Sequence, residues 1–368
     1  MKYCNVCVLP NSRPNLNFDK FGVCDGCSKI QVKTNWKLRL EEFKKLVTNI
    51  KKKQKNYDCL IPVSGGKDST WQVLVAKKFG LKILCVTWRS PARNKLGQSN
   101  LDNLIRLGVD HIDFSIDKNI EKNFIKKTFV KFGNPLIPMH LALHAIPTRI
   151  AIEKDIPLIL WGENSAYEYG GHKSFKGKSM NNKWRKVFGV NEGKPINYWL
   201  DKNLTERDLY SYKIPDTKKI NEKKIKEVFL GYYFEWSPKK IFDISKKFGF
   251  KSAKKPKTGF YKFADIDDAF LITIHHLMKW YKFGFTREWD NLSIEIRNKK
   301  KTRDQALKII SEKGLTLPQK EINKFCKYIG ITKKNYLQII DKFRNKKIWY
   351  KEKNKWKINN FLIKNWKW

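Results

Sequence analysis

Apolar runs of strand length alternate with helical patterns along the first half of the chain. Helical spacing of apolar residues marks helices near 36–53, 70–79, 100–107, 120–132 and 139–154. The predicted strands are Tyr57–Val63, Leu81–Val86, Asp110–Ile116 and Pro157–Trp161. Strands that alternate with helices predict a parallel, doubly wound α/β sheet that binds its ligand at the carboxyl ends of the strands.

The second half has a different pattern. Residues 172–215 are rich in Lys, Asn and Gly and suggest an insertion or lid over the sheet edge. The region 216–345 is predicted to be mainly helical and to serve a substrate or partner. The tail 346–368 alternates apolar and basic residues, which favours a hairpin, although Trp and Lys could also stack on single-stranded nucleic acid or lie on an anionic membrane.

The large net positive charge is only weak support for a nucleic-acid partner. The 368 residues carry a net charge of +42, which invites a nucleic-acid partner, but only 12 of the 77 basic residues are Arg, the type preferred for phosphate and base contacts. No run of about 20 apolar residues and no signal-like start is present, so we expect a cytoplasmic protein. Disulfides are rare there, and the seven Cys are then ligands, catalysts or core residues.

Four of these cysteines form two matched C-x2-C knuckles. Cys4 and Cys7 are separated from Cys24 and Cys27 by 16 residues. Four thiolates in this arrangement predict a closed, structural Zn²⁺ site within a ribbon-like unit over residues 1–35. A redox pair, unligated thiols or a nucleic-acid-binding knuckle are the alternatives.

A glycine loop follows the first predicted strand and opens a helix, within a nucleotide-binding domain expected at 36–215. Strand, glycine turn and helix N-terminus together can cradle phosphate, and an acid in the loop makes sense if Mg²⁺ lies between it and the phosphates. Thr87 and Gly162 leave later strands at the same edge and should face the nucleotide. The loop residues are Ser64, Gly65, Gly66, Lys67, Asp68 and Ser69.

This loop resembles the SGGxDS signature of the PP-loop ATP pyrophosphatases. With the knuckles and Trp161–Gly171, the chain is similar to the N-acetyl sugar amidotransferases of bacterial surface-polysaccharide pathways, such as those of lipopolysaccharide O-antigen or nonulosonic acid synthesis. The similarity runs from Cys4 to about Asp341 and leaves out the tail. It also includes Pro215–Thr217, Leu230–Trp236, Asp265–Asp268, Lys282–Arg287, Ile296-Arg297 and Thr302-Arg303.

The resemblance implies that ATP adenylates the acetamido oxygen of a nucleotide-linked sugar. Ammonia then displaces AMP and leaves an acetamidino group. Lys67 and Asp68 would act on the phosphates, with Glu163 the first candidate for proton transfer and Glu168 the second. The residues expected at the sugar are Glu163, Asn164, Glu168, Tyr169, Arg287, Arg297 and Arg303.

The three arginines of that set are a quarter of all arginines in the chain. They fall within 17 residues, which suggests bidentate clamping of a sugar diphosphate. Salt bridges to acids along the same segment are an equally good explanation. Those acids are Glu288, Asp290 and Glu295.

Ammonia has to reach such a site unprotonated, and nothing in the chain resembles a glutaminase. The remaining cysteines, Cys59, Cys85 and Cys326, lack a nucleophile's setting. The resemblance implies a separate glutaminase subunit and a cyclase-like subunit that channels ammonia, similar to those of histidine biosynthesis. Two other readings remain open, namely a tRNA-thiolating PP-loop enzyme and a non-enzymatic zinc-ribbon protein that binds nucleic acid.

Overall fold

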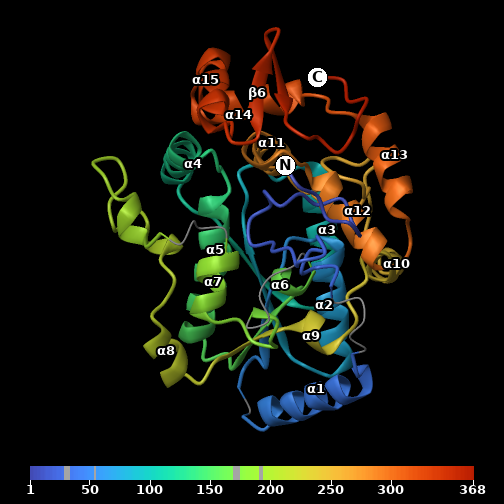
Figure 1. Cartoon of the computed structure of the whole chain (residues 1–368). Coiled ribbons are helices and arrows are strands. Elements are labelled where there is room, and N and C mark those ends of the chain that lie inside the picture. The colour runs from blue at the N-terminus through green and yellow to red at the C-terminus, as the bar shows by residue number, and fades with distance from the viewer. Residues whose placement is uncertain (29–33, 54, 169–174, 190–193) are drawn as a thin grey trace.

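A five-stranded parallel sheet forms the centre of the computed structural model, which describes residues 1–28, 34–53, 55–168, 175–189 and 194–368 (Figure 1). The strand order is β3-β2-β1-β4-β5, so the order reverses between β1 and β4. The strands are β1 (Cys59–Pro62), β2 (Ile83–Trp88), β3 (Asp110–Phe114), β4 (Leu158–Trp161) and β5 (Lys226–Phe229). The predicted fold class, a parallel α/β sheet followed by a mainly helical region, is confirmed.

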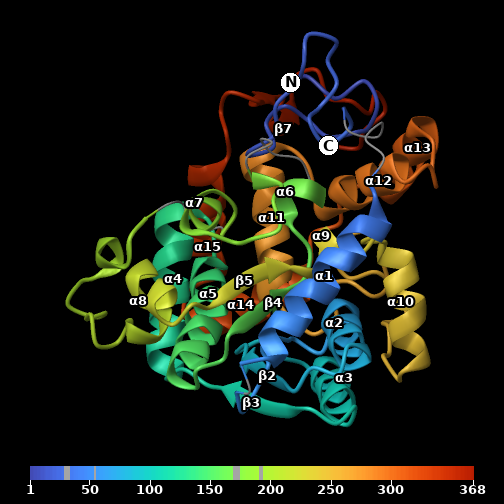
Figure 2. The same ribbon diagram turned by 90° about the horizontal axis from the view of Figure 1, so that it is seen from below.

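Helices cover both faces of the sheet (Figures 1 and 2). Those before β5 are α1 (Trp36–Lys51), α2 (Lys67–Lys78), α3 (Lys95–Ile105), α4 (Lys118–Phe132), α5 (Ile137–Glu153), α6 (Ser165–Glu168), α7 (Asn182–Phe188) and α8 (Thr217–Glu222), with 3₁₀ turns at Ile196–Trp199 and Tyr210–Tyr212. Those after it are α9 (Leu230–Tyr233), α10 (Pro238–Lys247), α11 (Leu271–Phe283), α12 (Arg287–Arg297), α13 (Arg303–Lys313), α14 (Gln319–Ile329) and α15 (Lys333–Phe343).

Successive residues of each strand point into two different cores. Leu60 and Ile159 pack with α4 and α5, whereas Cys59, Ile61 and Leu158 pack with α1 and α2. Burial on both faces explains why these strands are continuous apolar runs instead of alternating ones. The reversal of strand order between β1 and β4 marks the carboxyl ends of these two strands as the ligand edge of the sheet.

One strand lies outside the domain predicted for the sheet. β5 pairs in parallel with β4, with Leu158 opposite Lys226 and Trp161 opposite Phe229. The predicted boundary at 215 is therefore wrong, because residues 226–229 complete the sheet. The strand is four residues long and begins with two charged residues, so its pattern does not distinguish it from the helical segments around it.

The segment 172–215 is not a lid in the part that the structure describes. Trp199 and Tyr212 are fully buried, and their rings lie 5.6 and 5.0 Å from that of Phe124 on α4. Burial of such large aromatic side chains stabilises a packed layer, not a mobile cover. Trp199 and Tyr212 therefore belong to the core on the α4 and α5 side of the sheet.

The two ends of the chain lie together on the helical region (Figure 2). The tail forms an antiparallel hairpin of β6 (Trp349–Glu352) and β7 (Lys355–Ile358). Trp349 and Trp366 pack on Trp280 of α11, at 5.2 and 5.6 Å between ring centroids, and the Met1 amino group donates to the Asn359 carbonyl at 3.1 Å. These tail tryptophans are part of the core and are not available to stack on bases.

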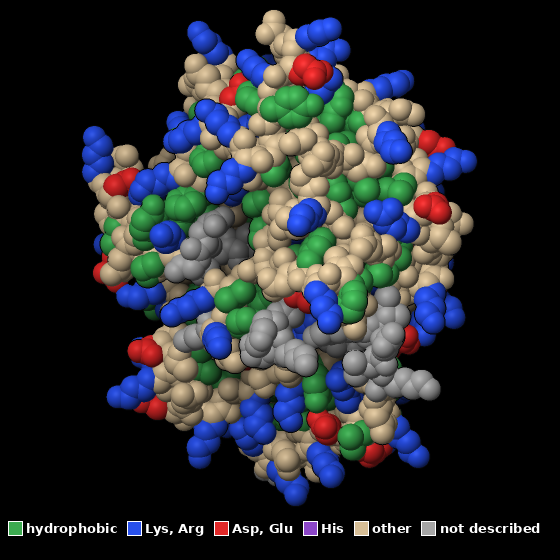
Figure 3. Space-filling model, viewed as in Figure 1, with side chains coloured by type: hydrophobic (Ala, Val, Ile, Leu, Met, Phe, Trp, Pro, Cys, Tyr) green, Lys and Arg blue, Asp and Glu red, His purple; other side chains and the backbone are tan. Residues whose placement is uncertain are grey.

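The positive charge is spread over the face of the molecule that is seen in Figure 3. Figure 3 shows Lys and Arg side chains over the whole visible face, with no single stripe of them. A stripe or one basic face is the usual footprint of a nucleic-acid-binding surface. Within the described ranges, no helix is long and apolar enough to cross a membrane.

Candidate functional site

The glycine loop joins β1 to α2 and is held by its own hydroxyl groups. Ser64 N–H donates to Ser69 Oγ at 3.1 Å, and Gly66 N–H donates to Ser64 Oγ at 3.3 Å. Gly65 has φ +82°, and a Cβ there would lie 2.6 Å from the backbone nitrogen of Leu101, so this position accepts only glycine. The loop is thus fixed with the N-terminus of α2 directed at the ligand edge.

A cavity of about 420 Å³ lies over this loop, in the size range of small-molecule sites. From the predicted nucleotide set, the side chains or backbone of Ser64, Gly66, Lys67, Asp68 and Thr87 line it. The other three predicted residues do not line the cavity but contact residues next to its wall. Gly65 packs on α3, Ser69 bonds to the loop, and the Gly162 carbonyl accepts from Gly231 N–H at 3.1 Å.

Lys67 is buried and forms an ion pair with Asp68 in the cavity wall. Thr87 lies in the cavity wall and donates its hydroxyl to the Val63 carbonyl at 2.8 Å, so this group is bonded within the sheet. A cation and a carboxylate side by side at a helix N-terminus suit a phosphate chain that carries Mg²⁺.

An acidic loop faces the glycine loop across the cavity, and sequence reasoning did not assign it to the site. It consists of Asp265, Ile266, Asp267 and Asp268. Asn94 fixes it, because its N–H donates to the Asp267 carbonyl at 2.9 Å and its side-chain amide donates to the Ile266 carbonyl at 2.7 Å. Three acids within four residues were the signal in the sequence.

The three acids of this loop have different surroundings. Asp265 lies 3.3 Å from His276 Nε2 and accepts from Thr258. Asp268 accepts from Phe270 N–H at 2.9 Å and from Ile272 N–H at 3.1 Å, at the start of α11. Burial raises the pKa of Asp267 to about 6 and that of Asp268 to about 7. Such carboxyl groups favour a nearby cation, and a divalent ion would bring them back to the charged form.

Glu163 and Glu168 enter the same cavity from the end of β4 and from α6. Burial raises the pKa of Glu163, and the Asp68 charge adds to this effect. Burial also raises the pKa of Glu168 to about 8, with Glu163 as the next contribution. A raised pKa brings a carboxyl group closer to the range in which a general acid or base works.

Asn164 is wrongly assigned to the sugar. Its amide nitrogen donates to the Phe175 carbonyl at 2.8 Å, and its oxygen accepts from Trp184 Nε1 at 3.0 Å and from Ala166 N–H at 3.0 Å. The side chain is buried and anchors the start of α6. Tyr169, the neighbouring prediction, lies outside the described residues.

The three predicted sugar-clamping arginines separate. Arg287 lines the cavity, with its Nε 3.9 Å from Asp265 Oδ2. Arg297 lies instead against the cysteine cluster, and Arg303 Nε donates to the Cys7 carbonyl at 3.1 Å. The clamp is therefore wrong for Arg297 and Arg303, because the packing of α12 and α13 directs both toward the N-terminal knuckles.

The salt-bridge alternative applies in part to Arg287, whose positive charge helps to hold the pKa of Asp290 below its ordinary value. Each of the three nearby acids also contacts a residue of another element. Lys313 contacts Glu288, Tyr261 donates to Glu295, and both Arg13 and Lys279 contact Asp290.

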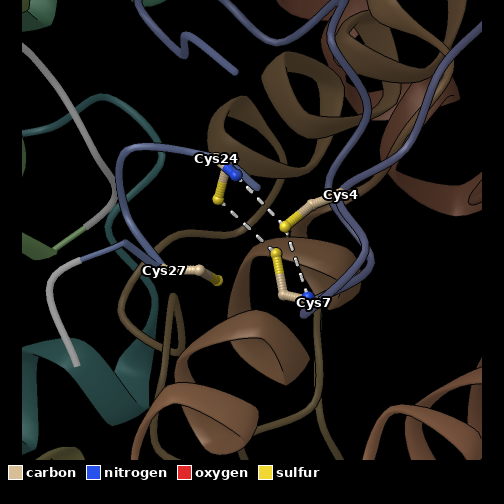
Figure 4. Close-up of side chains that lie close together, drawn as sticks. All are labelled: Cys4, Cys7, Cys24 and Cys27. Carbon is tan, nitrogen blue, oxygen red and sulfur yellow. Dashed lines mark hydrogen bonds between the residues drawn. The ribbon is translucent and has the colours of Figure 1, made fainter. Parts of the chain in front are cut away.

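Four buried sulfur atoms converge at the N-terminus (Figure 4). The ligand atoms of Cys4, Cys7, Cys24 and Cys27 all lie within 4.8 Å of one another, with Cys7 and Cys24 sulfurs 3.8 Å apart. A tetrahedron of sulfurs around one ion at about 2.3 Å has edges of about 3.8 Å. The cluster therefore fits a single tetrahedral metal ion and is too tight for a separate iron at each cysteine.

Arg297 connects this cluster to the cavity. Its Nε lies 3.5 Å from Cys27 Sγ and its Nη2 lies 3.7 Å from Cys24 Sγ, while Nη1 donates to the Glu168 carbonyl at 2.8 Å. One guanidinium thus offsets the negative charge of the thiolates and holds α6. Sequence reasoning could not find this, because the contact spans 270 residues.

The other cysteines are core residues. Cys59 and Cys85 lie fully buried in β1 and β2, and burial raises the pKa of both thiols, that of Cys85 to about 12. Cys326 is buried in α14, and burial raises its pKa as well. Thiols in this state are poor nucleophiles.

Comparison with known proteins identifies the C-terminal part. Residues 257–362 match the family model described as LPS biosynthesis protein WbpG-like, C-terminal domain. The match covers less than a third of the chain, and it shows what residues 257–362 are similar to. The matched range contains the acidic loop, Arg287, Arg297 and Arg303, and it also covers most of the tail, which the resemblance had left out.

An uncharacterized protein of Methanocaldococcus jannaschii is 30% identical over 86 residues, which is 23% of this chain and 31% of that protein. The chain thus spans about a third of that relative.

The solved structures that are similar to this chain have low sequence identity to it. NMN synthetase from Francisella tularensis is 15% identical, and the similarity covers 61% of this chain and 100% of that structure, with a TM-score of 0.29. The NH3-dependent NAD synthetase from Campylobacter jejuni is 16% identical, and the similarity covers 50% of this chain and 99% of that structure, with a TM-score of 0.29. The U34-tRNA thiolase NcsA from Methanococcus maripaludis, solved with its [4Fe-4S] cluster, is 12% identical. The similarity covers 86% of this chain and 90% of that structure, with a TM-score of 0.34.

Proposed function

We propose that this protein is an ATP-dependent N-acetyl sugar amidotransferase of LPS biosynthesis. The reaction converts an acetamido group of a nucleotide-linked sugar to acetamidino, with release of AMP and pyrophosphate. The observation that carries the proposal is the glycine loop Ser64–Ser69 facing the acidic loop Asp265–Asp268 of a WbpG-like domain across one cavity. Phosphate-binding backbone opposite cation-binding carboxylates is the arrangement that ATP with Mg²⁺ needs.

The chemistry starts with a poor electrophile. The amide oxygen attacks the α-phosphorus of ATP and expels pyrophosphate, which gives an O-adenylated imidate. Ammonia adds to its carbon, and the C–O bond breaks so that AMP leaves with the former amide oxygen. Ammonia loses a proton in this step, and the amidine retains both nitrogens.

The residues of the cavity have distinct parts in this scheme. The glycine loop and Lys67 hold the phosphates, and Asp68 with Asp267 would hold Mg²⁺, which supplies charge neutralisation at the phosphates. We assign to Glu163 the proton that ammonia loses, because this residue follows β4 into the cavity and burial raises the pKa of its carboxyl group. Glu168 is the second candidate for this proton.

Zinc is the ion we propose for the four-cysteine cluster, since its closed thiolate shell and bond length match the sulfur spacing. Its role is structural, and no step of the reaction passes through it. Ammonia is supplied by a glutaminase subunit through a cyclase-like subunit. The cytoplasmic location stays a prediction.

Pyrophosphate release by the purified protein tests the proposal. The assay contains ATP, Mg²⁺ and ammonium, with a panel of UDP- and CMP-linked acetamido sugars, their free forms and bulk tRNA. We expect release that depends on one nucleotide sugar. Release stimulated only by tRNA would replace the proposal with a tRNA-modifying activity.

A variant of Glu163 tests whether this residue accepts the proton that ammonia loses. Glu163→Gln keeps the size of the side chain and removes its basicity, so we expect a fall in kcat of about 100-fold with little change in the KM for ATP. Amidine formation at the wild-type rate would remove Glu163 from the mechanism.

A further inference from the structure

The ammonium group of Lys67 lies close to two aromatic rings from the second half of the chain. Its Nζ is 5.3 Å from the centroid of the Phe263 ring and 5.9 Å from that of the Trp236 ring. All three residues line the nucleotide cavity. An aromatic ring attracts a cation at separations of up to about 6 Å. We call Trp236 and Phe263 the aromatic pair.

Phe263 is held in place by other rings and by α10. It stacks on Phe242 of α10 with the centroids 4.6 Å apart, and on Tyr261 at 4.9 Å. The same helix also holds the backbone of the lysine, because the fully buried Ser245 donates its hydroxyl to the Lys67 carbonyl at 2.7 Å. One helix therefore fixes the Phe263 ring and the start of α2 relative to each other.

Trp236 is held against the end of β4 and against α2. A Cβ at Gly162 or at Gly231 would lie 3.4 Å from atoms of its indole, so the ring lies on the backbone of both glycines. It also meets the ring of Trp71, on α2, edge-on with the centroids 5.3 Å apart. The indole is thus packed against the strand end and the helix that form the phosphate site.

The aromatic pair differs from a carboxylate in its effect on the charge of Lys67. The ammonium group also contacts Asp68, the residue proposed to hold Mg²⁺. An ion pair neutralises the charge that a lysine offers to phosphate, whereas a ring attracts a cation through its quadrupole and carries no net charge. The aromatic pair therefore keeps the ammonium group in place and leaves its charge for the nucleotide.

We propose that Trp236 and Phe263 are positioning residues for the lysine that binds phosphate. They hold the ammonium group at the cavity wall, where it meets the phosphates of ATP, and neither ring takes part in a chemical step. The inference rests on the proposed function for ATP as the ligand. It adds that the phosphate site of the glycine loop is completed from the second half of the chain, with Phe263 inside the range that matches the WbpG-like model.

Fluorinated phenylalanines in place of Phe263 test the aromatic pair. Fluorine withdraws electron density from the face of the ring and weakens its attraction for a cation, with little change in shape. Mono-, di- and trifluorophenylalanine are incorporated at Phe263 of the full chain, and calorimetry with Mg²⁺ gives the Kd of α,β-methylene-ATP. The same series at Phe129 is the control, because that ring is fully buried against Phe325 and Tyr336 of α14 and α15.

We expect the Kd to rise with each added fluorine, by about 3- to 10-fold for the trifluorinated ring, since a contact of this type contributes about that much to affinity. In a Lys67→Met background the Phe263 series should leave the Kd unchanged, because no cation is left to attract. The Phe129 series should have no effect in either background. Trp236→Leu should also raise the Kd, and Trp236→Phe should restore part of the affinity, because it keeps a ring. Thermal unfolding verifies that each variant is folded.

The outcomes separate this inference from the proposed function. An unchanged Kd across the Phe263 series, or an equal rise with and without Lys67, would overturn the role of the aromatic pair even where amidine forms. Tighter binding would overturn it as well, because the rings would then compete with the phosphates for the lysine. A graded rise without any amidine product would support the pair and overturn the proposed reaction. A wild-type protein that binds no ATP analogue would overturn both.

Discussion

Replacing Arg297 by Met should weaken both the metal cluster and the active site. The side chain offers N–H groups to Cys27 and Cys24 at 3.5 and 3.7 Å and donates to the Glu168 carbonyl at 2.8 Å. Met keeps the length and apolar stem but removes the charge. The thiolates then lose a nearby positive charge, and α6 loses its anchor.

The magnitude follows from these contacts. Groups that contact metal ligands from outside typically change metal affinity 10- to 100-fold, so we expect zinc affinity to fall by about that factor. Loss of the charged hydrogen bond to Glu168 should lower the free energy of unfolding by about 1.5–3 kcal/mol. Because Glu168 lines the cavity, kcat should fall more than the KM for ATP rises.

Chelator competition, followed by a colorimetric zinc indicator, measures the affinity, and thermal unfolding of the zinc-loaded protein measures the stability. Arg303→Met is the matched control, because Arg303 donates to the Cys7 carbonyl and, among the described residues, to no cysteine sulfur. It should lose stability with a smaller change in zinc affinity. Equal zinc affinity in wild type and Arg297→Met would refute the reasoning.

Three further predictions concern the cavity. Gly65→Ala should destabilise the protein by more than about 1 kcal/mol, because φ is +82° and the new Cβ meets Leu101, whereas Gly66→Ala should cost less; thermal unfolding of both variants decides this. Glu168 has a folded pKa of about 8 against an ordinary 4.5, so its ionisation costs stability as the pH rises between these values. Glu168→Gln should therefore raise the melting temperature of the nucleotide-free protein at pH 8 and leave it unchanged at pH 4. Asp68→Asn should raise the Mg²⁺ concentration for half-maximal pyrophosphate release about 10-fold or more, and an unchanged requirement in a magnesium titration would remove Asp68 from the ion site.

The parts predicted well are those whose signal is local. A strand, a glycine turn and a helix start follow one another within 20 residues, so the loop Ser64–Ser69 and its neighbours could be placed from sequence. The two cysteine knuckles are equally local, and their sulfurs do converge. In both cases the covalent chain itself brings the groups together.

The parts predicted poorly depend on contacts between distant segments. The acidic loop joins the site because Asn94 holds it from 172 residues away, and nothing in its own sequence shows which surface it faces. Arg297 was assigned to a sugar because of its residue type, but the packing of α12 turns it to the cysteines. Asn164 was assigned to the sugar together with its neighbours, yet its amide is bonded to Trp184 and Phe175.

The fate of the amide oxygen tests the central claim most directly. An acetamido sugar nucleotide labelled with heavy oxygen in its acetamido carbonyl is converted in the presence of ATP, Mg²⁺ and ammonium, and the products are weighed by mass spectrometry. Adenylation of the amide predicts that the label appears in AMP and that the sugar carries an acetamidino group. An amidine product with unlabelled AMP, or AMP formed while the label stays on the sugar, would contradict it.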